Sequence, residues 1–310
     1  MWPQIIISSG KGTLSFGRSI VSKNKAVEER SCVLRKKEST VLSEQEIFAE
    51  LDALVGLRSV KEMLKEVYAF WEIQKCRKKQ HLASEPMVFH MIFSGNPGTG
   101  KTTVARIFGQ ILKQIGVIES GHIVEAERAD LVGEYIGHTA QKTREKIKKA
   151  FGGVLFIDEA YSLARGGEKD FGKESIDVLV KAMEDYKNDF ILILAGYPSE
   201  MESFLSANPG LRSRFPIQLS FDDYTEKELL LIADLFCEKR EYKLSEHARK
   251  RLGEMVMAER YGRESVFGNA RAVRNLIEKA IRKQATRLVG RPNLLRHELL
   301  MLEECDFVVK

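Results

Sequence analysis

Several features that would assign a chain to a membrane or secreted class are missing from this sequence of 310 residues. No apolar run approaches the roughly 20 residues that a membrane-spanning helix needs, so we expect no insertion into a membrane. The first residues, Met1 to Ile7, lack a basic leader and carry too short an apolar stretch for a secretory signal. The composition, 44% hydrophobic and 30% charged, is typical of a globular protein with a sizeable core and room for two domains.

Cysteine is scarce, with 4 residues that lie far apart in the sequence. Neither these cysteines nor the 6 histidines show the spacing of metal ligands, so they predict no metal centre. Widely spaced cysteines suit a reducing compartment, and with no secretory signal they favour a cytoplasmic location. The cysteines are Cys32, Cys76, Cys237 and Cys305.

The net charge of +5 is concentrated at one end of the chain. Residues 1–37 contain eight basic and two acidic residues, so they carry +6 and the remainder is near neutral at −1. A near-neutral body argues against nucleic acid as its partner. We interpret residues 1–42 as a flexible basic segment, and keep open that it is an arm that docks on an anionic surface.

An eight-residue run has the pattern G-x-x-x-x-G-K-T of a phosphate-binding loop. An apolar run at residues 88–93 precedes it as a buried strand, and an apolar-periodic segment at 103–114 follows it as a helix. The glycines let successive N–H groups face phosphate oxygens, while Lys101 adds a positive charge and the Thr102 hydroxyl can ligate Mg²⁺. The residues expected to bind ATP here are Gly95, Asn96, Pro97, Gly98, Thr99, Gly100, Lys101 and Thr102.

Asp158 and Glu159 end another apolar run, residues 154–157. Carboxylates at the carboxyl end of a buried parallel strand lie where open α/β sheets bind ligands. Alone, the pair is equally well explained as a solvated acidic turn, but the phosphate loop upstream favours a nucleotide role. We expect Asp158 to hold Mg²⁺ and Glu159 to polarise a water against the γ-phosphate, which favours hydrolysis of ATP over kinase chemistry.

Apolar runs alternate with helical patterns over residues 86–221, which predicts a parallel sheet with helices on both faces. Helices are expected before it, in residues 43–85, and the strand pattern stops after it. Residues 222–310 read as several helices, so we predict an α/β domain followed by a small all-helical domain. The predicted strands are 88–93, 122–126, 154–157, 190–195 and 217–221.

The order of these motifs resembles the AAA+ ATPases, a P-loop family in which a helical lid follows an α/β module. Residues 127–139 and 156–163 are similar to the branch that contains red-type Rubisco activase and stage V sporulation protein K. The run 164–174 is most similar to the sporulation member. The resemblance covers about residues 43–290.

The resemblance implies roles for further residues. Val55 and Gly56 match the segment that lines the adenine pocket, although a helix-entry turn explains the pair equally well. Tyr135, Ile136 and Gly137 match the pore loop that grips a polypeptide in the central channel of a ring, and the alternative is a packed surface tyrosine. An exposed aromatic gives a large apolar contact at a small entropy cost, and glycine lets the loop move.

Arginines supply the other contacts that the resemblance implies. Arg214, and as second choice Arg212, match the arginine finger, a guanidinium that a neighbouring subunit inserts to stabilise charge on the phosphoryl group. Arg271 matches the second sensor, a lid residue that reaches the γ-phosphate. Tyr197 departs from the family, because many members carry Asn or Thr there as first sensor, and its role stays open.

The predicted function is a homo-oligomeric ATPase ring, a hexamer, that uses ATP and Mg²⁺ to pull on a protein substrate through its central pore, in sporulation. A finger that acts across an interface requires such a ring. Two alternatives stay open: ATP-dependent remodelling of nucleic acid, and a scaffold that hydrolyses slowly and signals by assembly. The aromatic loop and the near-neutral body favour the ring that acts on protein.

Overall fold

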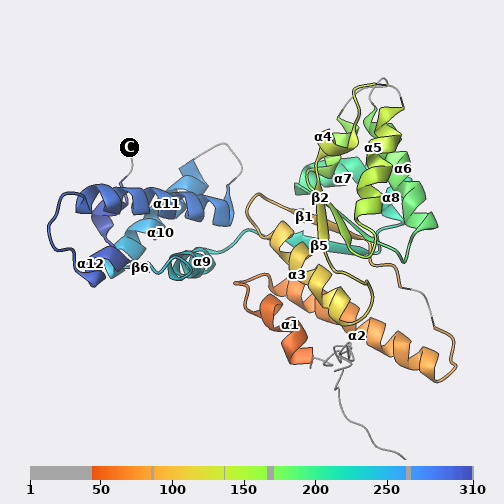
Figure 1. Cartoon of the computed structure of the whole chain (residues 1–310), viewed down its shortest axis with the longest axis horizontal. Coiled ribbons are helices and arrows are strands. Elements are labelled where there is room, and N and C mark those ends of the chain that lie inside the picture. Colours follow the sequence, from red (N-terminus) through yellow and green to blue (C-terminus); the bar gives the residue numbers. More distant parts are fainter. Residues whose placement is uncertain (1–43, 85–86, 136, 166–170, 263–266, 309–310) are drawn as a thin grey trace, which may run out of the picture. The chain divides into compact units, whose positions relative to one another are not determined.

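Figure 1 shows the computed structural model of the chain, which divides into two units, Met1–Val41 and Leu42–Lys310. The basic segment 1–42 and Ile136 of the predicted pore loop lie outside the described residues. The structure describes residues 44–84, 87–135, 137–165, 171–262 and 267–308, all of which belong to the second unit.

The centre of the second unit is a five-stranded sheet with parallel pairings in the order β2-β3-β4-β1-β5. Every strand overlaps a predicted apolar run, but β1 begins at Met91 and not at Val88, because its ladder with β4 starts where Met91 faces Ile193. β3 and β4 are buried along their whole length, as expected for strands covered on both faces. The strands are β1 (Met91–Gly95), β2 (Ile123–Ala126), β3 (Val154–Ile157), β4 (Ile191–Gly196) and β5 (Ile217–Phe221).

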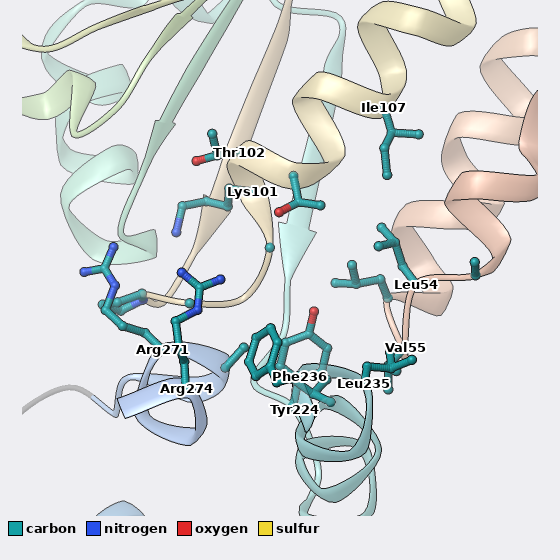
Figure 2. Close-up of a pocket in the computed structure, with 18 of the residues that line it drawn as sticks. Leu54, Val55, Lys101, Thr102, Ile107, Tyr224, Leu235, Phe236, Arg271 and Arg274 are labelled. Atoms are coloured by element: carbon teal, nitrogen blue, oxygen red, sulfur yellow. The ribbon is translucent and has the colours of Figure 1, made fainter. Parts of the chain in front are cut away.

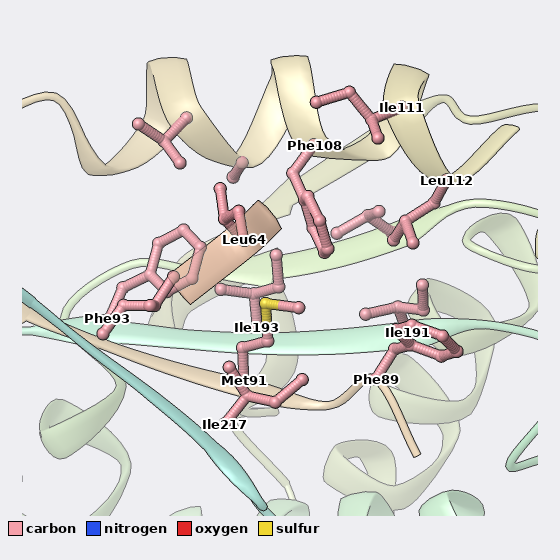
Figure 3. Close-up of a cluster of buried hydrophobic side chains, with 14 of the residues drawn as sticks. Leu64, Phe89, Met91, Phe93, Phe108, Ile111, Leu112, Ile191, Ile193 and Ile217 are labelled. Carbon is pink, nitrogen blue, oxygen red and sulfur yellow. The ribbon is translucent and has the colours of Figure 1, made fainter. Parts of the chain in front are cut away.

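Alternate residues of the strands enter two apolar cores, one on each face of the sheet. Met91 and Phe93 pack in the first core, whereas Ile92 between them packs in the second. Figure 3 shows the first core, where the side chain of Ile193 points toward Phe108 on the helix above it. The helices of the first core are α1 (Glu44–Asp52), α2 (Arg58–Lys79) and α3 (Lys101–Gln114). Those of the second are α4 (Arg128–Leu131), α5 (His138–Lys149), η1 (Ala160–Ala164), α6 (Gly172–Asp185), α7 (Pro198–Ala207) and α8 (Pro209–Arg212).

After β5 the chain forms a helical lid with its own apolar core, which confirms the predicted order of an α/β domain and a helical domain. The lid also contains a parallel pairing of two very short strands, β6 (Lys243–Leu244) and β7 (Met301–Leu302). Their two-residue length leaves no alternation in the sequence from which to predict them. The lid helices are α9 (Glu226–Glu238), α10 (Glu246–Gly262), α11 (Asn269–Leu288), α12 (Arg296–Leu300) and η2 (Glu304–Asp306).

The strand order brings three loops together at one edge of the sheet. β4 lies between β3 and β1, so the segments that follow these three strands emerge side by side. They are the phosphate loop after β1, Asp158 and Glu159 after β3, and Tyr197 after β4. This edge is where open α/β sheets bind ligands.

None of the helices within the described ranges combines the length and apolar character needed to cross a bilayer.

Candidate nucleotide-binding site

The phosphate loop, residues 95–102, depends on two glycines for its curl. Gly98 and Gly100 have φ of 71° and 97°, in the left-handed region that glycine enters most readily. At Gly98 a side chain is also excluded by contact, because an added Cβ would lie 2.2 Å from the carbonyl oxygen of Gly268 in the lid. The loop therefore packs directly against the lid and accepts no side chain at this position.

Helix α3 begins at Lys101, directly after the loop, whereas the apolar periodicity predicted a start at Thr103. No side chain caps this end of the helix, and its first turn carries no acidic residue. The N–H groups of the first turn are therefore free of side-chain acceptors, and no acid there offsets the positive end of the helix. Such a helix start suits a phosphate.

Lys101 is only 8% exposed and its Nζ donates to the carbonyl oxygens of Gly95, at 2.7 Å, and Asn96, at 2.9 Å. Burial lowers the pKa of the Lys101 ammonium, an effect that the carboxylate of Asp158 opposes and the guanidinium of Arg271 reinforces. A polyphosphate bound here would favour the charged lysine. Lys101 thus lines the cavity with its Nζ held against the carbonyl oxygens of the loop itself.

Glu159 stands in a strained backbone conformation directly after β3. Its φ of 47° and ψ of 43° lie in the left-handed region, which costs a residue with a side chain about 1–3 kcal/mol. The turn is held locally, because the Glu159 amide donates to Oδ1 of Asp158 at 3.0 Å. Strain of this kind gathers at functional sites, which agrees with a functional role for the pair.

Tyr197, the residue whose role the sequence left open, reaches the same carboxylate. Its hydroxyl lies 3.5 Å from Oε1 of Glu159, at the outer limit for a hydrogen bond. Burial, together with the charge of Glu159, raises the pKa of the Tyr197 hydroxyl, so it remains a neutral donor. A tyrosine therefore occupies the place where the family often has a smaller polar residue.

Thr102 and Asp158 fit the Mg²⁺ that the resemblance implies. Within the described ranges, no group of three or more His, Cys, Asp or Glu side chains gathers as a metal cage. Mg²⁺ needs none, since it binds through one or two carboxylates together with phosphate oxygens and water. Thr102 and Asp158 line the same cavity as Lys101 and supply a hydroxyl and a carboxylate. Bound there, the ion would neutralise charge on phosphate oxygens.

These residues line one cavity of about 720 Å³, a size within the roughly 300–1,000 Å³ of ligand pockets. Figure 2 shows its two ends: Lys101 and Arg271 lie at one, and Leu54, Val55 and Ile107 lie at the other. A cationic end and an apolar end match the polyphosphate and the flat base of a nucleotide. Further apolar lining comes from Leu57, Ile232, Leu235 and Phe236.

The two residues predicted for the adenine pocket play different structural parts. Val55 lines the cavity, whereas Gly56 is not among the lining residues of the described chain. Gly56 has φ of 63°, and a Cβ there would lie 2.4 Å from Oε1 of Glu228 in α9. Val55 therefore lines the cavity in which the adenine is predicted to bind, and Gly56 shapes the entry to α2.

The three arginines predicted to contact the nucleotide lie in two different places, one inside the cavity and two outside it. Arg271 lines the cavity, whereas Arg212 and Arg214 are not among the lining residues of their own chain. Arg212 pairs with Glu202, with Nη1 and Oε1 3.2 Å apart. Arg214 is held more firmly, because its Nε donates to Oε1 of Glu184 at 3.0 Å and the side chain is 31% exposed. Of the three arginines, only Arg271 lines the same cavity as the phosphate loop and the two carboxylates of its own chain.

Tyr135 lies in the loop between α4 and α5 and is 66% exposed, so it is not a packed surface tyrosine. Its ring meets the edge of the His138 ring, with centroids 5.5 Å apart. Gly137 follows with φ of 84°, and a Cβ there would meet no atom of the described residues within 4 Å, its chain neighbours aside. Helix α5 begins at His138, directly after this glycine.

Sequence reasoning missed two functional groups of the described chain. Arg128 at the start of α4 donates from Nη1 to the carbonyl of Ser162 at 2.6 Å, which links the segment before Tyr135 to the turn after Glu159. Asp223 and Asn269 connect the lid to the phosphate loop. No motif marks these contacts, because each joins residues that are far apart in the sequence.

A phosphate loop after β1 and a carboxylate pair after β3, on a parallel sheet with a helical lid, define a P-loop nucleotide-binding protein. Residues 91–223 match the family model described as "ATPase family associated with various cellular activities (AAA)", and residues 225–310 match "AAA lid domain".

Curated relatives show which branch of this family the chain resembles. The chain is 50% identical over 298 residues to stage V sporulation protein K of Bacillus subtilis, covering 96% of this chain and 92% of the relative. It is 41% identical to the chloroplastic ribulose bisphosphate carboxylase/oxygenase activase of Cyanidioschyzon merolae, covering 85% and 91%. It is 44% identical to protein CbbX of Cereibacter sphaeroides, covering 79% of each. The chain therefore belongs to the AAA ATPase family, in the branch of these relatives, and is an ATPase.

A solved structure agrees on the fold. The Thermotoga maritima RuvB Holliday junction branch migration motor is 23% identical, with a TM-score of 0.52 that covers 79% of this chain and 67% of that one. At this identity the likeness shows the AAA fold alone.

Proposed function

We propose that the chain assembles into a homo-oligomeric ring, a hexamer, that hydrolyses ATP to pull on a protein substrate through its central pore. The observation that carries the proposal is Tyr135, which is 66% exposed in a loop followed by a glycine with open space around it. An exposed aromatic face contacts an extended polypeptide without reading its sequence. Ile136, which lies outside the described residues, completes the proposed pore loop with Gly137.

The proposed chemistry uses residues from both domains. Glu159 polarises the water that attacks the γ-phosphate of ATP, a role for which its place beside Asp158 and the Tyr197 hydroxyl provides support. Thr102 and Asp158 hold Mg²⁺. Lys101 binds the phosphate oxygens, as do backbone N–H groups of the phosphate loop, residues 95–102, in which Pro97 alone has none to donate.

Residues that close the proposed site are Arg271 at the phosphates and Val55 at the adenine, while Gly56 allows the turn that places Val55 there. A neighbouring subunit supplies the arginine finger, Arg214 in first place and Arg212 in second, because neither lines the cavity of its own chain. To reach a neighbouring site, Arg214 must leave the carbonyl oxygen of Gly210 as well as Glu184, and the partly exposed ion pair itself accounts for about 1 kcal/mol or less. The site of one subunit is thus incomplete without the next.

The names of two relatives favour a protein target and a cellular role. One relative is named as an activase of an enzyme, and another as a sporulation protein. We infer that this chain acts on a protein during sporulation. Replacing the Bacillus subtilis relative with this chain would test the role: spore counts should recover with the unaltered chain and not with Lys101→Ala. Failure of the unaltered chain, expressed at the normal level, would remove sporulation from the proposal.

The proposed threading is tested by Tyr135→Ala, with Tyr135→Phe as the matched control. Tyr135→Ala should leave basal ATP hydrolysis and the melting temperature nearly unchanged, because the residue lies outside the nucleotide cavity, but it should abolish stimulation by an unfolded protein. Tyr135→Phe should retain most of that stimulation, since the ring face matters more than the hydroxyl. Hydrolysis is measured with and without an unfolded polypeptide and with and without DNA. Stimulation by DNA alone, or normal stimulation of Tyr135→Ala by protein, would contradict threading.

A further inference from the structure

Asn269 occupies an unusual position at the start of α11, two residues before Arg271. It is fully buried, with 0% of its surface exposed, and its φ of 46° places it in the left-handed region. Asparagine tolerates this conformation better than most residues, but a buried amide must satisfy its polar atoms. Its partners therefore indicate why an asparagine stands here.

The amide of Asn269 connects the lid to the hinge and to the phosphate loop. Its Oδ1 accepts from the Tyr224 amide at 3.1 Å, and its Nδ2 donates to Oδ1 of Asp223 at 2.7 Å. The same Nδ2 lies 3.3 Å from the carbonyl oxygen of Pro97 in the phosphate loop. Asp223 and Tyr224 belong to the segment between β5 and α9, so one side chain contacts the α/β domain, the hinge and the lid.

Asp223 connects Asn269 to a further residue of the phosphate loop. Its Oδ1 also accepts from Nδ2 of Asn96 at 3.0 Å, so one carboxylate oxygen joins an asparagine of the loop to an asparagine of the lid. We call Asn96, Asp223 and Asn269 the hinge triad.

Two further bonds run alongside the triad. The Ala270 amide donates to the Gly98 carbonyl at 3.2 Å, and the Tyr224 hydroxyl donates to the Thr99 carbonyl at 3.1 Å. Four consecutive loop residues, 96–99, are thus hydrogen-bonded to the hinge or the lid.

The direction of these bonds matters. A phosphate loop presents its N–H groups to the ligand, and here the carbonyl oxygens of Pro97, Gly98 and Thr99 accept hydrogen bonds from groups of the hinge and lid. A change in loop curvature on phosphate binding therefore moves the acceptors to which α11 is attached. Arg271 lies in the first turn of that helix and lines the cavity.

We propose that Asn269, through the hinge triad, is a positioning residue that transmits the state of the phosphate loop to the lid and holds Arg271 in the nucleotide cavity. The proposal rests on the nucleotide-site part of the proposed function and does not depend on protein threading. It differs from a simple structural role, in which Asn269 would stabilise the fold equally with and without nucleotide.

Substitutions can separate the side chain from its backbone conformation. Asn269→Gly removes the amide while keeping a residue that accepts positive φ. Asn269→Asp keeps the shape and the acceptor but loses both N–H donors beside Asp223. The double variant Asn269→Asp/Asp223→Asn places a donor opposite an acceptor again. Asn293→Gly is the matched control, because Asn293 also has a positive φ, 58°, but is exposed in a lid loop.

Lid movement can be followed by energy transfer between dyes on Cys76 and Cys305, both exposed, one on α2 and one in the lid. The background carries Cys32→Ser, while Cys237 is buried, which raises the pKa of its thiol to about 11 and keeps it unreactive. Labelled protein is diluted into an excess of unlabelled protein, so that transfer is measured within one chain. The probe is ATPγS with Mg²⁺, compared with protein alone.

The unaltered chain and Asn293→Gly should show a nucleotide-dependent change in transfer. Asn269→Gly and Asn269→Asp should bind ATPγS within about threefold of the unaltered chain but lose most of that change, and kcat should fall about ten- to a hundredfold, the scale of a misplaced catalytic group. The double variant should recover part of both, because the group at position 223 can then donate to position 269 but cannot accept from Asn96 through the same atom. A full change in Asn269→Gly would overturn the proposal, as would a double variant that regains its melting temperature but none of the change. Absence of ATPγS binding by the unaltered chain would instead refute the nucleotide site itself.

Discussion

Two loops of this molecule use glycine in the same backbone conformation under opposite conditions. Gly98 in the phosphate loop and Gly137 beside Tyr135 have φ of 71° and 84°. A Cβ on Gly98 would lie 2.2 Å from the Gly268 carbonyl, whereas a Cβ on Gly137 would meet no atom of the described residues within 4 Å, its chain neighbours aside. The first loop is fixed at Gly98 by the lid, whereas the second has open space at Gly137. A loop that recognises one ligand benefits from rigidity, and a loop proposed to follow a moving chain benefits from freedom.

The largest effect should come from Gly98→Ala, with Gly137→Ala as its counterpart. Gly98→Ala should weaken ATP binding by more than about a hundredfold, since the added methyl group displaces the start of α11 from the loop. Gly137→Ala should cost only the strain of a left-handed alanine, about 1–2 kcal/mol in the free energy of unfolding, and leave ATP binding unchanged. Calorimetry with ATP and a denaturant titration measure both. Equal losses of ATP binding in the two variants would show that the two glycines do not differ in this way.

A second test asks whether ATP hydrolysis depends on the carboxylate beside the phosphate loop and not on an exposed carboxylate outside the cavity. Glu159→Gln should bind ATP but hydrolyse it about a hundredfold more slowly, because glutamine keeps the shape and cannot attract a proton. The control is Glu119→Gln, at an exposed glutamate that does not line the nucleotide cavity, and this variant should hydrolyse ATP at the normal rate. Release of phosphate is measured at saturating ATP. Hydrolysis by Glu159→Gln within about threefold of the unaltered chain would remove Glu159 from its proposed role.

A third test concerns the two arginines that we propose reach the site from a neighbouring subunit. Arg214→Ala should lower hydrolysis at least about tenfold while leaving ATP binding intact, and Arg212→Ala should lower it less. Mixing Arg214→Ala with Lys101→Ala should restore part of the activity, because an intact site and an intact finger then meet at shared interfaces. The rate is followed as the mixing ratio varies. Full activity of a sample shown to be monomeric would rule out action across an interface.

The smallest effect is expected at the opposite end of the sheet, at His90. His90 is 1% exposed and accepts from the Leu192 amide through Nδ1 at 3.0 Å. Burial lowers the pKa of His90 from 6.5 to about 4, so the unfolded chain binds a proton that the folded chain refuses. The free energy of unfolding should therefore fall as the pH drops from 6.5 toward 4, by about 2 kcal/mol between pH 7 and pH 5.

Denaturant titrations at several pH values check this expectation, with His90→Gln as the variant that cannot titrate. Its amide oxygen can still accept from Leu192, while its free energy of unfolding should depend less steeply on pH in this window. Parallel pH profiles for the two proteins would show that other groups cause the acid sensitivity. ATP binding at pH 7 should be equal in both, since His90 does not line the nucleotide cavity.

The sequence predicts best what depends on neighbours in the chain. The phosphate loop, the parallel strands and the lid follow from local motifs and apolar periodicity, and the family match confirms them. Apolar periodicity did not predict the start of α3 at Lys101, because the first turn has no apolar residue before Val104. Periodicity detects which face of a helix is buried, so it cannot register a turn that serves a ligand.

What could not be predicted depends on contacts across the fold. Asp223 binds Asn96 and Asn269, which are separated from it by 127 and 46 positions, and no spacing rule connects them. The left-handed conformation of Glu159 is equally hidden, because nothing in its neighbouring residues requires it. These positions emerge only when the sheet edge and the lid come together.

The pairing of β6 with β7 has a consequence for the order in which the molecule matures. It joins Lys243 to Met301 at the end of a long stretch of chain, and Leu302 and Phe307 complete the core of the lid. During synthesis the α/β sheet emerges first and can fold, whereas the lid waits for residues 301–307. Until then α11 has no settled place, so the nucleotide cavity is finished last. Hydrogen exchange of a chain that ends at residue 300 should show protection of β3 and β4 but little protection of α11, and full protection of α11 in that chain would contradict this sequence of events.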